Sequence, residues 1–418
     1  MNAGAASLGV MSYEPSQDIL ERYARVLVDF ALGDGAGIKP GDTVRIVGAE
    51  ETKPLFAEVC KAAWRSGGNV LAELQPTQDE RFNMERSFYE LASDAQLDHF
   101  PAKYRRGLLD EIDHQVYIAG TDYPQAMKGV DPQKMMRRQA AHMPLIGWQQ
   151  EKDAAGLLHW TIGLWGTEAM AAEAGLSVEA YWEQIIRACF LDDPDPIARW
   201  HETIEAIHHY RDWLNSLPIE RLHVEAEDTD LWLTLGEHRR WIGGGGRNIP
   251  SFEIFTSPDW RGTNGHIKFS EPLYTHGTLV NGIQLEFKDG LVVGVTAEQN
   301  AGLIEQIVAA PGGNRVGEFS MTDARLSRID RFMANTLYDE NMGGPFGNTH
   351  LAVGMSLNHT YDGDAAAVTD EEWEQLGYNL DAAVHNDIVS TNDRTVTATM
   401  RGGSERVIYA AGNFQTEA

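Results

Sequence analysis

Six residues in the second half of the chain carry side chains of the types that bind divalent metal ions. They are three glutamates, two histidines and one aspartate, namely Glu253, Glu318, Glu340, His350, His385 and Asp387. A mixed set of nitrogen and oxygen donors suits zinc, manganese, cobalt or iron(II), and is unsuited to copper or an iron–sulfur cluster. The carboxylates are numerous enough for one of them to bridge two ions.

The segments around these residues favour strands and turns. Glu253 follows a turn that contains a proline, and Glu318 begins a strand led by Gly317. His385 and Asp387 are two residues apart in an extended-type segment, and residues i and i+2 of a strand share one face. One imidazole and one carboxylate can therefore reach a single ion. Each residue type is also common on protein surfaces, so spacing alone does not assign a metal site.

The first half of the chain indicates a layered arrangement of helices and parallel strands. Short apolar strands at 39–49 and 69–76 alternate with amphipathic helices at 18–32 and 54–68. A helix at 131–142 precedes a separate short apolar segment at 143–149. Strands that alternate with helices predict a wound α/β domain with a mostly parallel sheet, which we assign to residues 1–217.

Residues 218–418 indicate a second domain, of the α+β class and rich in β-strands. Its segments alternate apolar and polar residues, and residues 282–297 predict a hairpin that turns near Asp289-Gly290. Helices are expected near 322–336 and 369–377. A chain of 418 residues is consistent with two domains at roughly 150 or more residues each. The metal-binding residues all fall in the second domain.

The charge of the chain excludes several kinds of partner. It has 34 basic and 62 acidic residues, a formal net charge of −28. Nucleic acids and anionic membranes present phosphate groups that this surface would repel, so neither is an expected partner. No basic leader precedes an apolar run, and no window holds the roughly 20 apolar residues of a membrane span. The sequence predicts a cytoplasmic protein.

Three other patterns are not interpreted as reactive sites. Cys60 and Cys189 lie in apolar helical contexts and are expected to be buried, inert thiols. The glycine run 243–246 does not lead into a helix, so we interpret it as a flexible turn or a loop that borders a site, and not as a phosphate cradle. The four-residue spacing within one further set is typical of the solvent-exposed face of a helix, and the set consists of His201, Glu205 and His209.

The order and spacing of the motifs resemble the aminopeptidase T and aminopeptidase S family of dinuclear metallo-aminopeptidases, over nearly the whole chain. Two first-half segments, IIRACFLDDPDP and WTIGLWGTEAMAAEAGLS, are similar to that family too. The second-half motifs that carry the resemblance are Asn248-Ile249-Pro250, Glu253-Ile254-Phe255-Thr256, Gly317-Glu318, Asn335-Thr336-Leu337-Tyr338-Asp339-Glu340-Asn341, His350-Leu351-Ala352-Val353-Gly354 and His385-x-Asp387.

The resemblance implies an N-terminal α/β domain, a C-terminal metal domain and a homodimer whose active sites face an enclosed cavity. The six acidic and histidine residues named above would hold two divalent ions per chain, of zinc, cobalt or manganese, with Glu318 as the bridge. The implied reaction is the release of N-terminal residues from short peptides by a metal-activated water.

The chain departs from the family pattern near the site. Members carry a tyrosine seven residues after the first histidine of the set, a position held here by Leu357, which cannot donate a hydrogen bond. Tyr361, four residues further on, is a candidate to take over that role. Phe252 replaces a common glycine before the first predicted ligand, and residues 343–349 lengthen the segment between Glu340 and His350.

Two alternatives to an aminopeptidase stay open at the level of sequence. The fold's relatives include ring-cleaving dioxygenases of dihydroxypyridines, and His350, His385 and Asp387 could form their triad around one iron(II). The presence of three glutamates argues for two ions instead. The other alternative is a homologue that lost peptidase chemistry together with the tyrosine.

Overall fold

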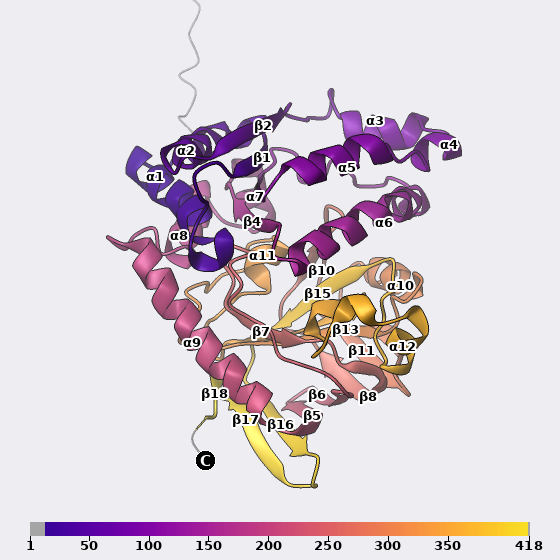
Figure 1. Cartoon of the computed structure of the whole chain (residues 1–418). Coiled ribbons are helices and arrows are strands. Elements are labelled where there is room, and N and C mark those ends of the chain that lie inside the picture. Colours follow the sequence, from indigo (N-terminus) through magenta and orange to yellow (C-terminus); the bar gives the residue numbers. More distant parts are fainter. Residues whose placement is uncertain (1–12, 417–418) are drawn as a thin grey trace, which may run out of the picture.

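Four parallel strands form the sheet of the first half of the chain in the computed structural model, which describes residues 13–416 (Figure 1). Their order across the sheet is β2-β1-β3-β4, and all neighbouring pairs are parallel. The strands are β1 (Thr43–Ala49), β2 (Asn69–Gln75), β3 (His114–Ala119) and β4 (His159–Leu164). Parallel neighbours need long crossover connections, and helices supply them here.

Helices precede, connect and follow these strands. They are α1 (Gln17–Arg25), α2 (Lys53–Arg65), α3 (Met84–Leu91), α4 (Asp94–Leu97), α5 (Ala102–Glu111), α6 (Pro132–Ala154), α7 (Glu168–Glu173), α8 (Val178–Ala188) and α9 (Pro196–Ser216). The expected separation of a helix at 131–142 from a segment at 143–149 is wrong, because α6 runs through both, including Pro144, as one helix. Its apolar part packs against neighbours, as Trp148 does beside Leu109 and Leu158, and this packing overrides the local preference of proline.

The second half of the chain forms antiparallel sheets. The larger sheet has the order β12-β11-β8-β6-β5-β16-β17-β18, and the smaller has the order β15-β14-β13-β7. The strands are β5 (Ile219–Ala226), β6 (Thr229–Thr234), β7 (Glu253–Thr256), β8 (Asp259–Lys268), β9 (Leu273–Thr275), β10 (Thr278–Val280), β11 (Gln284–Lys288), β12 (Leu291–Thr296), β13 (Val316–Thr322), β14 (Asn348–Gly354), β15 (His385–Ser390), β16 (Thr395–Met400), β17 (Glu405–Ala410) and β18 (Asn413–Phe414). The predicted α/β half followed by a β-rich half is therefore confirmed.

Three short helices interrupt the second half, namely α10 (Ala301–Ala309), α11 (Thr336–Asp339) and α12 (Asp370–Gln375). The helix expected near 369–377 is confirmed as α12. The helix expected near 322–336 is wrong, since only its last residue is helical. The Asp339 carboxylate accepts hydrogen bonds from the backbone N–H groups of Met333 and Asn335. These bonds and the burial of Ile329 and Met333 hold the segment in a non-helical path.

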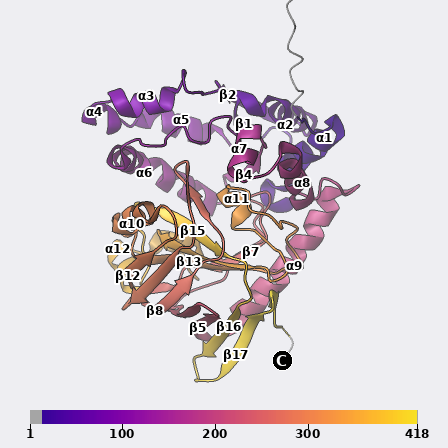
Figure 2. The same ribbon diagram turned by 180° about the vertical axis from the view of Figure 1, so that it is seen from behind.

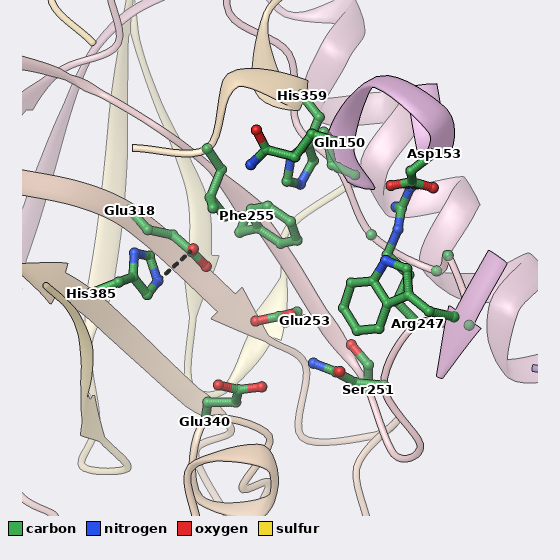
Figure 3. A pocket seen from close by; sticks show the side chains of 18 of the residues that line it. Gln150, Asp153, Arg247, Ser251, Glu253, Phe255, Glu318, Glu340, His359 and His385 are labelled. Carbon is green, nitrogen blue, oxygen red and sulfur yellow. Dashed lines mark hydrogen bonds and ion pairs between the residues drawn. The ribbon is translucent and has the colours of Figure 1, made fainter. Parts of the chain in front are cut away.

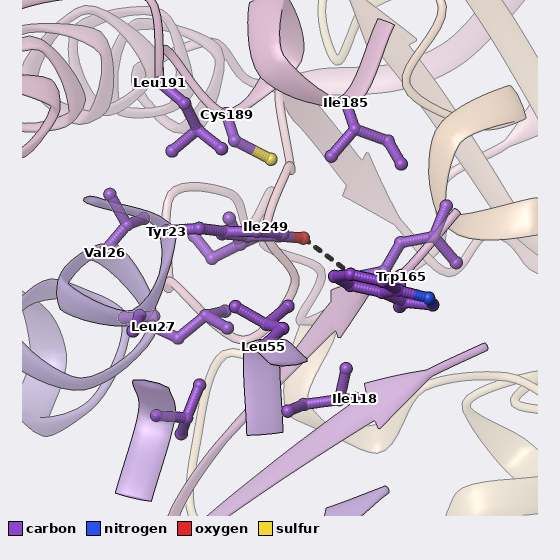
Figure 4. Close-up of a cluster of buried hydrophobic side chains, with 14 of the residues drawn as sticks. Tyr23, Val26, Leu27, Leu55, Ile118, Trp165, Ile185, Cys189, Leu191 and Ile249 are labelled. Atoms are coloured by element: carbon purple, nitrogen blue, oxygen red, sulfur yellow. Dashed lines mark hydrogen bonds between the residues drawn. The ribbon is translucent and has the colours of Figure 1, made fainter. Parts of the chain in front are cut away.

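Two large hydrophobic clusters make up most of the core, and α9 contributes to both. Trp200 belongs to the first cluster, whereas Ile207 and Leu214 belong to the second. Figure 4 shows part of the first cluster, where the Tyr23 hydroxyl accepts a hydrogen bond of 2.8 Å from the Leu164 backbone N–H. The predicted domain boundary after residue 217 falls between α9 and β5. It remains a prediction, because residues of the second half such as Phe252 pack in the first hydrophobic cluster.

Helix α6 lies between the parallel sheet and the antiparallel sheets in both views of the chain (Figures 1 and 2). This places it over the smaller antiparallel sheet, where the predicted metal-binding residues are found. Within residues 13–416, none of the helices combines the length and the apolar character that a bilayer crossing needs.

Candidate metal centre

The smaller antiparallel sheet brings predicted ligands from three neighbouring strands onto one face. Glu318 on β13 lies opposite Ala352 on β14, and Ala352 lies opposite Asp387 on β15. Directly opposed residues in an antiparallel pair share a face, so Glu318 and Asp387 do as well. His385 joins them, because it is two residues from Asp387 on the same strand.

Glu253 and His350 reach the same face through later residues of β13. Ser320 and Thr322 follow Glu318 at intervals of two and therefore share its face. His350 lies opposite Ser320, and Glu253 on β7 lies opposite Thr322. The register of four strands thus brings five of the six predicted residues together.

The other face of this sheet is part of the second hydrophobic cluster. The alternate positions of β7, β13, β14 and β15 are apolar and buried, namely Ile254, Phe319, Met321, Leu351, Val353 and Ile388. Every residue of β13 and β14 is buried. The strands that carry the charged residues are therefore fixed in place by a packed core.

A β-bulge at Gly317 sets the orientation of Glu318. The pairing register between β13 and β14 shifts between Val316 and Glu318. Strict alternation would put both residues on one face, yet Val316 belongs to the hydrophobic cluster and Glu318 faces the charged residues. A side chain at Gly317 would collide with the carbonyl oxygens of Gly354 and Met355. Glycine is therefore needed at the bulge that turns Glu318 to the site.

The five residues form two groups of three donors that share Glu318. One group is Glu253, Glu318 and His350, the other is Glu318, His385 and Asp387, and the donor atoms of each lie within 4.8 Å of one another. Glu318 Oε1 is 3.2 Å from His350 Nε2. Glu318 Oε2 is 3.5 Å from His385 Nε2, the contact marked by a dashed line in Figure 3. The two oxygens of one carboxylate therefore face two separate groups of donors.

The cluster holds more buried negative charge than its histidines can balance. Burial raises the pKa of Glu253 to about 8, with the nearby charge of Glu318 as the next cause. Burial and the neighbouring carboxylates also raise the pKa of Glu340 well above its usual range. Burial opposes the charged form of His350, but Glu318 and Asp387 raise its pKa to about 9. Buried charges of this density are stabilised by bound cations, so the residues fit a divalent metal site.

Glu340 lies at the C-terminal end of α11 and lines the same cavity as the cluster. Its carboxylate belongs to neither group of three within the described residues. The Asn348 side chain holds the Glu340 backbone through a 3.0 Å hydrogen bond to the carbonyl oxygen. Asn341 Nδ2 also lies 3.4 Å from Glu340 Oε1. The structure thus brings the sixth predicted residue to the cavity, but not into the donor groups.

A cavity of about 530 Å³ lies over the cluster. One wall is the charged face of the sheet, together with Phe255, Leu357 and His359. The opposite wall consists of α6 and the loop that carries the glycine run, and its lining residues include Gln150, Asp153, Gly243, Gly244, Gly245, Gly246 and Arg247. The glycine run is therefore a loop that borders the site, one of the two interpretations left open by the sequence.

The structure separates the two candidates for the family tyrosine position. Leu357 lines the cavity, whereas Tyr361 is not among the cavity-lining residues of the described chain. The Tyr361 ring packs edge-on against Trp373, with 5.2 Å between ring centroids. His359 lines the cavity instead, and burial and the Arg247 charge lower its pKa to about 4. Its imidazole is therefore neutral at physiological pH.

Sequence reasoning missed His359 and Arg247 as cavity residues. His359 lies two residues after Leu357, and this proximity to the family tyrosine position was the available signal. Arg247 directly follows the glycine run, but its place depends on pairing between Asn248 and Ile162 of β4, which no local pattern reveals.

The predicted exposure of the α9 residues and the predicted burial of the two cysteines are confirmed. The predicted solvated face of α9 is exposed at His201, Glu205 and His209. Cys60 and Cys189 are buried free thiols, and burial raises their pKa to about 11 and about 12 respectively. Within residues 13–416 the only groups of three or more donors with metal-binding geometry are the two at Glu318.

Comparison with known proteins places these features in a family. Aminopeptidase PepS of Streptococcus thermophilus is 27% identical over 423 residues, covering 94% of this chain and 97% of that protein. Aminopeptidase T of Thermus thermophilus is 27% identical over 419 residues, covering 95% and 99% respectively. The solved structure of wild-type AmpT from Thermus thermophilus aligns with a TM-score of 0.78 at 25% identity, over 95% of this chain and 98% of that chain.

A solved 2,5-dihydroxypyridine dioxygenase from Pseudomonas putida aligns over 97% of this chain, with 12% identity and a TM-score of 0.47. Similarity this low carries no argument for the dioxygenase alternative. The model of the thermophilic metalloprotease family M29, by contrast, matches residues 16–414. The resemblance inferred from the motifs is confirmed, and the chain belongs to the M29 family of thermophilic metalloproteases.

Proposed function

We propose that the protein is a metal-dependent aminopeptidase that releases N-terminal residues from short peptides. The observation that carries the proposal is the position of Glu318, whose two carboxylate oxygens face two separate groups of donors. Membership in the M29 family and the names of the aminopeptidase relatives support it. The cavity of about 530 Å³ is within the size range of small-ligand sites, which suits a short peptide.

The proposed metal ligands are the residues predicted from the sequence, with Glu318 between two divalent ions of zinc, cobalt or manganese. They are Glu253, Glu318, Glu340, His350, His385 and Asp387. A pair of ions held by these residues would supply Lewis-acid chemistry, which would polarise a substrate carbonyl and activate water near neutral pH. The mixed nitrogen and oxygen donors of the set are suited to these metals.

The other residues of the cavity position the substrate. Phe255 and Leu357 are apolar lining residues, and they exclude water from the side chain of the residue to be released. His359 is neutral and can donate one N–H hydrogen bond to a substrate oxygen. Leu357 cannot donate, and Tyr361 packs against Trp373 away from the cavity lining. Among these three residues, His359 is therefore our proposed hydrogen-bond donor to the substrate.

A homodimer in the cytoplasm is also part of the proposal. Large apolar side chains are exposed in the first half of the chain, namely Phe82, Met84, Leu91, Tyr104 and Leu157. Contact between two subunits would remove such side chains from water. Light scattering coupled to gel filtration tests this part, and a monomer at all concentrations would contradict it.

The function is tested with metal-free protein to which zinc, cobalt and manganese are added separately. We expect release of the N-terminal residue from dipeptides and from amino-acid anilides, and close to two ions per chain by elemental analysis. One iron per chain with oxygen uptake on a dihydroxylated ring would support a dioxygenase instead. Two bound ions without hydrolysis of any peptide would indicate a homologue that has lost the activity.

A further inference from the structure

Arg247 presents unused hydrogen-bond donors on the cavity wall opposite the sheet. Its Nη2 donates to both carboxylate oxygens of Asp153, at 3.0 and 2.8 Å. No acceptor within residues 13–416 pairs with its Nε or Nη1 groups, and the side chain is 39% exposed. A guanidinium carries five N–H groups in a fork that matches a carboxylate. Arg247 can therefore bind a second carboxylate while it keeps Asp153.

The glycine run beside Arg247 adds backbone donors to the same wall. None of the N–H groups of residues 243–246 donates a hydrogen bond within the described part of the chain. The φ angles of Gly244 and Gly246 are +76° and +70°, whereas the other two glycines have no positive φ. Alternation of this kind is a feature of backbone segments that gather N–H groups around an anion. The loop is held from its other side, because His208 and Arg211 of α9 contact its carbonyl oxygens.

One cavity joins this wall to the metal cluster. Figure 3 shows Arg247 and Asp153 on one side of the pocket, Glu318 and His385 on the other, and His359 between them. Arg247, His359, Glu318 and His385 all line the same cavity of about 530 Å³. One molecule of two or three residues inside this cavity can therefore contact both walls.

Resting on the proposed aminopeptidase function, we propose that Arg247 and the glycine run 243–246 bind the C-terminal carboxylate of the substrate. The α-amine of the peptide then lies at the acidic cluster, and its carboxylate lies at Arg247. Among the described residues of this wall, Arg247 is the only one with free guanidinium donors. The protein is accordingly selective for dipeptides and tripeptides with a free C-terminus. A longer peptide or a C-terminal amide offers no carboxylate at this position.

The experiment compares one dipeptide with its C-terminal amide on the metal-loaded protein. We expect kcat/KM for the acid to exceed that for the amide by about 10- to 100-fold, the range for a hydrogen bond to a charged group. Arg247→Gln should bring the ratio to about 1, and Arg247→Lys should retain part of it. Equal rates for acid and amide in the wild type would overturn the proposal.

Asp153→Asn is the matched control for a purely structural role. If the ion pair between Arg247 and Asp153 only holds α6 against the glycine loop, both Arg247→Gln and Asp153→Asn should lower the rates on acid and amide alike. The melting temperatures of the two variants should then fall by similar amounts. The proposal instead expects Asp153→Asn to keep the preference for the acid. An acid preference that survives in Arg247→Gln would also contradict it.

Binding separates this inference from the proposed function. Calorimetry with a dipeptide analogue that has a methylene in place of the scissile carbonyl, as acid and as amide, needs no hydrolysis. Tighter binding of the acid that depends on Arg247, in a protein that hydrolyses nothing, would support the carboxylate site and refute the aminopeptidase proposal. Equal binding of the two analogues would refute the carboxylate site whatever the activity.

Discussion

The two walls of the cavity are built in opposite ways. The sheet wall consists of strands in which every residue of β13 and β14 is buried, and its reverse face packs into the second hydrophobic cluster. The other wall consists of α6, of whose described residues none is fully buried, and a loop of four consecutive glycines. One cavity thus has a wall of fully buried strands that carries charged residues, and a wall whose polar side chains, such as Asp153 and Arg247, are partly exposed.

This difference separates two tasks. Clustered carboxylates need a framework that prevents them from moving apart, and a packed sheet supplies it. Selection among substrates needs side chains that can be substituted without disturbing that framework. Segments with few buried contacts meet this need. Substitutions of the charged residues on the sheet wall should therefore affect metal binding and stability, whereas substitutions of the polar side chains on the other wall should affect the choice of substrate.

The largest effect is expected from Glu318→Gln on the sheet wall. Glu318 is shared by both donor groups, so the loss of one of its charged oxygens should lower metal content and activity by more than about 100-fold while the fold persists. Even substitution of residues that only hold metal ligands in place lowers metal affinity or activity 10- to 100-fold. Elemental analysis, activity and circular dichroism provide the readout. His201→Ala, on the exposed face of α9, should leave metal content unchanged. Full metal content and activity in Glu318→Gln would refute the bridging assignment.

Metal removal should lower the stability of the protein, since the sheet wall then holds unbalanced buried carboxylates. An ion present at a hundred times its dissociation constant contributes about 2.7 kcal/mol to the free energy of unfolding. Calorimetry with and without a chelator should therefore show a clear fall in melting temperature. The same chelator should produce a smaller fall in Glu318→Gln. An unchanged melting temperature in the wild type would argue against resident ions.

Leu357→Tyr should raise peptidase kcat by at least about 10-fold, because a hydroxyl donor near a reacting carbonyl is typically worth 10²- to 10³-fold. The leucine already lines the cavity, so the new hydroxyl should enter it. Tyr361→Phe should leave kcat unchanged, since that ring packs on Trp373. A large loss of kcat in Tyr361→Phe would show that the loop rearranges when substrate binds.

The glycine loop of the second wall offers a test of stability. Gly246→Ala should lower the free energy of unfolding by about 1–3 kcal/mol, because φ is +70° and the new Cβ would lie 2.9 Å from the Ala31 carbonyl oxygen. Gly245→Ala is the control, with no positive φ and its nearest contact at 3.4 Å. Denaturant unfolding measures both variants. Equal stabilities would show that this loop adapts freely to a side chain.

Patterns local in the chain predicted the sheet wall well. The hairpin expected at 282–297 is formed by β11 and β12, with its turn at Asp289 and Gly290. The placement of His385 and Asp387 on one face followed from the two-residue period of a strand. The orientation of Glu318 did not follow from it, because alternation cannot reveal a bulge at Gly317.

The second wall was harder to predict, because its geometry depends on contacts between distant segments. The sequence predicts that a helix ends at residue 142, yet α6 continues to Ala154 and reaches the cavity. Arg247 meets Asp153 only because its neighbour Asn248 pairs with Ile162 of β4. Such long-range pairing leaves no periodic trace in a single sequence.

In the smaller sheet, successive residues alternate between the face of the predicted metal ligands and the face in the core, so a change of register alters both faces at once. A single-residue deletion in β14 would exchange His350 with its apolar neighbours, burying an imidazole in the core and exposing Leu351 or Val353 to the cavity. Length changes in these strands should therefore be absent among functional descendants of this chain. The loops between the strands do not carry this register, so insertions there should be tolerated better than in the strands and could alter specificity.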